Sequence, residues 1–74
     1  MTPEYIRTLL KLTKVANDNL IAATISHLCS GVPQDQAGEP YGIQQEAISR
    51  LVRRINKVDA IVKEAMEIKS RNNS

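Results

Sequence analysis

The sequence contains very few aromatic residues. It has no tryptophan and no phenylalanine, and its only aromatic side chains are Tyr5 and Tyr41. Proteins that bind single-stranded nucleic acid by stacking present several aromatic faces to the bases. We therefore do not expect such a stacking surface. The core must be built from leucine, isoleucine, valine and alanine.

Cysteine and histidine each occur once, as Cys29 and His27. One residue of each type can form neither a disulfide within the chain nor a zinc site. The sequence also lacks a glycine-rich phosphate loop, a carboxylate pair at catalytic spacing and a serine–histidine–aspartate set. We therefore expect no metal, no cofactor and no enzymatic activity. No polar pocket for a small molecule can be recognised.

Long apolar runs are also missing, and the N-terminus has no basic segment followed by an apolar one. We therefore expect no membrane segment and a cytoplasmic location. The net charge is only +2, but the cations are unevenly placed. Arg50, Arg53, Arg54 and Lys57 follow one another without an intervening acid. Such a cluster is either a solvated helix face or a surface for phosphates.

What the sequence does contain is helical periodicity, which predicts a small all-α bundle of four to five helices. Thr2, Pro3 and Glu4 form a typical helix start. Gly31 is a typical C-terminal cap. No glycine or proline follows Gly42, so the last helix is expected to be long. The expected elements are a helix over about 3–12, a second from Asn17 or Asp18 to Gly31, a third over 34–39, a last helix over 44–70 and a polar tail at 71–74.

Residues 34–54 have the pattern of a helix-turn-helix, a scaffold that places its second helix in the major groove of DNA. The small residues Ala37 and Gly38 stand where the two helices would cross. Gly42 follows at the turn, which needs a residue that tolerates a positive φ. Pro40 cannot continue a helix, so the first motif helix is expected to end at Glu39 or to kink. We expect the two neighbours of the turn glycine to point into the core: Tyr41 and Ile43.

The second motif helix carries polar side chains away from its apolar face. Glutamine, serine and arginine are the side chains that read base edges and bind phosphates. The sequence thus predicts a site for double-stranded DNA at Gln44, Gln45, Ser49, Arg50, Arg53, Arg54 and Lys57. The whole of residues 1–70 then forms one DNA-binding domain.

The last helix has an apolar stripe with alternating spacings of three and four, from Ile48 to Ala65. A chain of this length has little left to bury the second half of that stripe. We expect this half to pair with a second copy of the chain, although it could instead fold back onto the first helix. The expected dimerisation residues are Val58, Ile61, Val62, Ala65 and Met66.

Six segments within about residues 2–58 carry a family resemblance: Thr2-Pro3-Glu4, Leu10-Lys11-Leu12-Thr13-Lys14-Val15, Gly31-Val32-Pro33-Gln34, Tyr41-Gly42-Ile43, Ala47-Ile48-Ser49-Arg50 and Val52-Arg53-Arg54. They resemble the TrfB/KorA-type plasmid transcriptional repressors. A weaker resemblance, in the layout of the helices and glycines, is to the PapB-type regulators of fimbrial operons.

The resemblance implies a homodimeric repressor that binds a palindromic operator and controls plasmid maintenance or conjugative transfer genes. It further implies that Gln34 touches a phosphate and that Arg53 and Arg54 lie near the DNA backbone. An alternative from another class is a protein-interaction adaptor or antitoxin-like partner. Such a protein would use the apolar face of the last helix and would not bind DNA.

Overall fold

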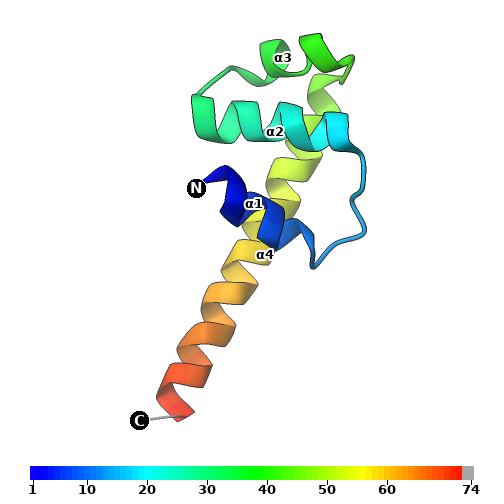
Figure 1. The fold of residues 1–74 in the computed structure, drawn as a ribbon. Coiled ribbons are helices and arrows are strands. Elements are labelled where there is room, and N and C mark those ends of the chain that lie inside the picture. Colours follow the sequence, from blue (N-terminus) through cyan, green and yellow to red (C-terminus); the bar gives the residue numbers. More distant parts are fainter. Residues whose placement is uncertain (73–74) are drawn as a thin grey trace.

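The computed structural model describes residues 1–72 as an all-α fold, which confirms the expected class. A long C-terminal helix is also confirmed, and residues 1–72 contain no strand. In chain order the elements are α1 (Pro3–Leu10), α2 (Asp18–Ser30), α3 (Gln34–Ala37), the 3-10 turn η1 (Glu39–Tyr41) and α4 (Gln45–Asn72) (Figure 1).

The start of α1 and both ends of α2 lie at residues whose chemistry specifies a helix boundary. The Thr2 hydroxyl accepts a hydrogen bond of 3.1 Å from the Tyr5 N–H, and Pro3 occupies the first position of α1. The Asn17 side chain accepts one of 3.1 Å from the Leu20 N–H at the start of α2. Gly31 ends α2 with a φ of 71°, where a side chain would be strained. The expected caps are therefore confirmed.

One continuous helix, α4, spans 28 residues. A rise of about 1.5 Å per residue makes it about 42 Å long, so it dominates the 48 Å long axis of the molecule. The shorter elements pack on its first half, and the second half projects alone (Figure 1). Every residue described after Val62 is exposed. The last helix was expected to end at residue 70, but it includes Arg71 and Asn72; the rest of the expected tail, Asn73 and Ser74, lies outside the described residues.

Two clusters of buried side chains form the core. The first joins α1 to the middle of α4 and consists of Ile6, Leu9, Leu10, Leu51 and Ile55. The second joins α2 and α3 to the start of α4 and consists of Ala23, Ala37 and Ile48. Because both clusters lie on one side of α4, that helix has one buried face and one face left for solvent or a partner.

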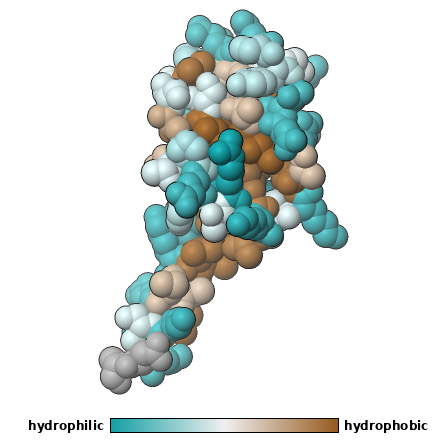
Figure 2. Space-filling model, in the orientation of Figure 1, coloured by the Kyte–Doolittle hydropathy of each residue, from teal (hydrophilic) through white to brown (hydrophobic). Residues whose placement is uncertain are grey.

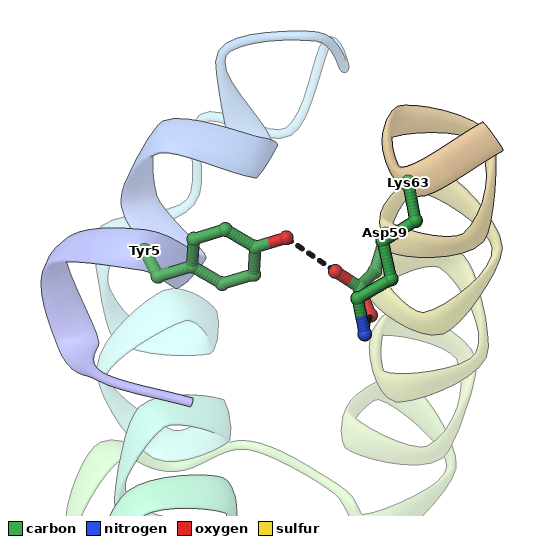
Figure 3. Close-up of polar contacts among 3 residues, drawn as sticks. All are labelled: Tyr5, Asp59 and Lys63. Atoms are coloured by element: carbon green, nitrogen blue, oxygen red, sulfur yellow. Dashed lines mark hydrogen bonds and ion pairs between the residues drawn. The ribbon is translucent and has the colours of Figure 1, made fainter. Parts of the chain in front are cut away.

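A polar contact between α1 and α4 was not foreseen from the sequence. Asp59 lies on the buried face of α4 and is only 8% exposed. Its carboxylate accepts a hydrogen bond from the Tyr5 hydroxyl and lies 3.0 Å from the Lys63 ammonium (Figure 3). A buried carboxylate needs such partners, because desolvation disfavours its charge. The helix α4 runs through Asp59 without a break.

The same contact changes the acid–base behaviour of its members. The hydrogen bond from Tyr5, and after it the one from Lys63, holds the pKa of the Asp59 carboxyl below its ordinary value. The hydrogen bond to Asp59 raises the pKa of the Tyr5 hydroxyl. Lys63 is 73% exposed in its side chain, so water screens its share of the interaction.

We expect this contact to make the free energy of unfolding fall at acidic pH. A carboxyl with a lowered pKa in the folded state stabilises the fold above its ordinary pKa of about 3.9 and loses that contribution as the pH falls further. The pKa of the Tyr5 hydroxyl is raised in the folded state. Its hydrogen bond therefore stabilises the fold below its ordinary pKa of about 10, and this stabilisation is lost as the pH rises above that value. Denaturant unfolding between neutral pH and about pH 3 should show a smaller decline for Asp59→Asn than for the wild type. Equal declines in the two proteins would exclude Asp59 as the source.

Candidate nucleic-acid interface

The connection from α3 to α4 is a tight corner built around Gly38. Its carbonyl accepts hydrogen bonds from the N–H groups of Tyr41, at 3.1 Å, and Ile43, at 2.9 Å. A Cβ added to Gly38 would lie 2.0 Å from the Ile43 carbonyl oxygen. Gly42 then turns the chain with a φ of 66°. Gly38 is thus required by a close approach of two backbone segments, and Gly42 by its backbone conformation.

Two expectations about this corner were wrong. The first motif helix ends at Ala37 instead of Glu39, and a 3-10 turn that contains Pro40 follows it. Proline lacks the N–H that would continue the α-helical hydrogen bonds. Tyr41 was expected in the core but is 39% exposed. Only Ile43 packs against the second core cluster.

The start of α4 presents its cations together on one face. Arg50, Arg53, Arg54 and Lys57 are all exposed and are separated by three, one and three residues. At 3.6 residues per turn these positions fall within about 100° of one another, on the side of the helix that faces away from the buried Ile55. We call them the cationic face. Gln44 and Gln45 are also exposed, at the point where α4 begins.

Two of these arginines lie beside apolar side chains. A cleft of about 320 Å³ is lined by Val15, Leu20, Ala47, Arg50, Leu51 and Arg54. Arginine can rest its aliphatic stem on such a surface while its guanidinium stays in water. The connection after α1 and the start of α2 thus help to orient Arg50 and Arg54. The sequence pattern did not indicate this contribution.

Ser49 and Gln34, both assigned to the DNA site from sequence, contact each other. The Ser49 hydroxyl donates a hydrogen bond of 2.9 Å to the Gln34 side-chain oxygen. The Gln34 amide nitrogen lies 3.4 Å from His27 Nε2, and His27 Nδ1 lies 2.7 Å from the Val32 carbonyl oxygen. A carbonyl only accepts, so Nδ1 carries the proton and Nε2 accepts from the amide. This series of hydrogen bonds links α2, α3 and α4. Its four residues are all half-buried: Ser49, Gln34, His27 and Val32.

The proposed dimerisation residues divide into two groups. Val58 and Val62 are half-buried and pack against the first core cluster, which contains residues of α1. Folding back onto the first helix, the alternative left open by the sequence, therefore occurs at these two positions. Ile61 is 55% exposed, Met66 is 62% exposed and Ala65 is also exposed. Hydrophobic side chains gather where α4 leaves the body and along its projecting part (Figure 2).

Within residues 1–72 no group of three or more histidine, cysteine, aspartate or glutamate side chains could hold a metal ion. None of the described helices is long and apolar enough to cross a membrane. No protein-family model, no curated protein and no solved structure matches the chain. The resemblance to the TrfB/KorA-type repressors thus rests on the sequence motifs alone.

Proposed function

We propose that this chain is a sequence-specific transcriptional repressor that binds double-stranded DNA as a homodimer. The observation that carries the proposal is the cationic face, which follows the α3–α4 corner directly and lies opposite the buried side of α4. In this proposal α3, the corner and the start of α4 act as a helix-turn-helix. Cations that only face solvent would not need to follow the turn of a helix-turn-helix. Four neighbouring cations can also bind several phosphates of one duplex.

The start of α4 would enter the major groove. Gln44, Gln45 and Arg50 would face base edges, where a good bidentate contact supplies about 1–3 kcal/mol of discrimination. Arg53, Arg54 and Lys57 would bind phosphates and supply affinity that falls with salt. Gln34 and Ser49 support the reading helix through their mutual hydrogen bond, and their direct contact with DNA is secondary in this scheme.

The mechanism we propose is steric. A dimer mirrors the two-fold symmetry of a palindromic operator, with one reading helix in each half-site. When the operator overlaps a promoter, the bound dimer excludes polymerase. The resemblance to the TrfB/KorA-type repressors supports genes of plasmid maintenance or conjugative transfer as targets.

Gel retardation on random duplex DNA at low salt tests DNA binding, and selection from a random oligonucleotide pool tests specificity. We expect a retarded band that weakens steeply as salt increases, because bound cations release counterions from DNA. We further expect the selected sequences to share a palindrome. A chain that fails to retard DNA at low salt is not a DNA-binding repressor, and retardation without any selected sequence would leave only non-specific binding.

The second candidate is a protein-interaction adaptor or antitoxin-like partner. It is favoured by the three large exposed apolar side chains on the projecting half of α4, which are Ile61, Met66 and Ile68. This protein would bind a partner through α4 and would not retard DNA, so the same gel experiment separates the two candidates.

A further inference from the structure

Three exposed apolar residues of α4, namely Ile61, Ala65 and Ile68, continue the line of its cations, whereas Met66 lies on another side of the helix. Ile61 and Ile68 are 55% and 42% exposed, and Ala65 lies between them. Spacings of four and three place these residues on one strip of a heptad pattern, with Ile61 and Ile68 at d positions and Ala65 and Asn72 at a positions. Arg54 occupies the d position one heptad before Ile61. The strip is therefore apolar and exposed in the projecting half, whereas next to the body its d position is the cation Arg54 and its a position, Val58, packs on the core.

We infer that this strip pairs with the same strip of a second copy, with the two helices parallel and in register. The inference rests on the homodimer of the proposed function and names the orientation and the residues of its interface. In a parallel pair, equal positions meet, so Ile61 lies opposite Ile61, and Ile68 opposite Ile68. An antiparallel pair combines a with d positions, which places each isoleucine opposite a smaller or polar residue such as Ala65 or Asn72.

Charge also favours the parallel arrangement. Glu64 occupies the g position before Ala65, and Lys69 occupies the e position five residues later. In a parallel pair a g side chain lies opposite the following e side chain of the other helix. Glu64 of each copy would thus meet Lys69 of the other copy, twice by symmetry. Within residues 1–72 both side chains are exposed, and neither forms an ion pair inside the chain.

Asn72 adds a device that sets the register. A single asparagine at an a position of a two-stranded coiled coil pairs with its equivalent and disfavours shifted alignments. Asn72 is exposed at the last described turn of α4. The other end of the interface is set by charge, since Arg54 at the next d position would meet Arg54 of the second copy. The two helices must therefore separate before this point.

The separation has a functional consequence. Arg50, Arg54 and Lys57 lie on the same side of α4 as Ile61 and Ile68, so in the dimer they line the gap between the two diverging helices. A duplex in this gap would neutralise both sets of cations. Basic regions that continue a parallel dimer helix bind DNA in this way. One face of α4 then serves both dimerisation and DNA binding.

Cross-linking in the absence of DNA tests the orientation. In a Cys29→Ser background, Ile61→Cys and Asn72→Cys place single thiols at opposite ends of the strip, about 16 Å apart along the axis. A disulfide needs Cα atoms within about 7 Å. We expect each variant to form a disulfide-linked dimer with itself under mild oxidation, with unchanged helicity by circular dichroism. Cross-links only in a mixture of the two variants would show antiparallel pairing, and no cross-link at all would show that a second copy does not cover the strip; both results overturn the inference.

A charge exchange tests the interface independently. Glu64→Lys should weaken self-association in sedimentation equilibrium about three- to tenfold, because two surface ion pairs are lost and two repulsions are gained. The double variant Glu64→Lys with Lys69→Glu should restore it. Glu67→Lys makes the same charge change on the outer side of α4 and should leave association almost unchanged. Equal effects of Glu64→Lys and Glu67→Lys would contradict the pairing.

The cross-linking experiment and the gel retardation experiment together separate failure of this inference from failure of the proposed function. A chain that retards DNA but lacks the expected cross-links has the proposed function with another dimer geometry. A chain that forms the cross-links but does not retard DNA is a parallel dimer without the proposed function.

Discussion

Gly38→Ala is expected to destabilise the protein by about 3 kcal/mol or more, at the upper end of what overpacking costs. The added Cβ would lie 2.0 Å from the backbone oxygen of Ile43, and a backbone atom cannot move aside as a flexible side chain can. To relieve the contact, the corner must open and lose the hydrogen bond of 2.9 Å from the Ile43 N–H to the Gly38 carbonyl. In a domain of this size, that loss corresponds to a fall in Tm of more than about 10 °C.

The other two glycines provide matched controls. Gly31 and Gly42 have positive φ values of 71° and 66°, but a Cβ added at either would meet no atom within 4 Å. Alanine at these positions should cost only the strain of the left-handed conformation, about 1–2 kcal/mol. In thermal unfolding, the Tm of Gly38→Ala should therefore lie well below the Tm values of Gly31→Ala and Gly42→Ala. If Gly38→Ala unfolded at the same temperature as Gly31→Ala, the close approach would not determine the corner.

The sequence was a reliable guide where a boundary is set by local chemistry. Thr2, Asn17 and Gly31 cap helices through contacts with residues a few positions away. Such contacts depend on few atoms, so the residue type nearly determines the structure. The long last helix was equally clear, because nothing after Gly42 interrupts it.

Contacts between distant residues could not be predicted. Tyr5 and Asp59 are 54 positions apart, and no periodic pattern indicates that a carboxylate on the buried face of a helix will meet a tyrosine. The same applies to Ser49 and Gln34, whose polar side chains suggested DNA contacts but bind each other. Polar residues that face DNA and polar residues that join helices have the same composition, and only the fold separates them.

The apolar stripe of α4 was ambiguous for a related reason. Periodicity shows which side of a helix is apolar, but not where along its length the body of the protein ends. The body covers Val58 and Val62 and leaves Ile61 and Ile68 exposed. The division between folding core and partner surface therefore depends on the placement of α1, which the spacing of residues in α4 cannot reveal.

The roles of the cations in DNA binding lead to the second prediction. Arg50 is nearest to the start of α4, where a reading helix enters the groove, whereas Arg54 is one turn further from that end. Arg50→Ala should therefore lose about 1–3 kcal/mol on the selected operator and relax the preference at one base-pair position. Arg54→Ala should weaken binding to all sequences alike and reduce the slope of log K against log salt by about one.

Titrations of the operator and of a scrambled duplex at several salt concentrations distinguish these roles. Arg7→Ala is the matched control, because Arg7 is an exposed arginine on α1 and lies outside the cationic face. It should leave both the affinity and the salt slope almost unchanged. A variant that contacts only phosphate must change the two duplexes equally, whereas a variant that reads a base must change their ratio. If Arg54→Ala altered base preference and Arg50→Ala did not, the direction in which α4 enters the groove would be the reverse of the one proposed.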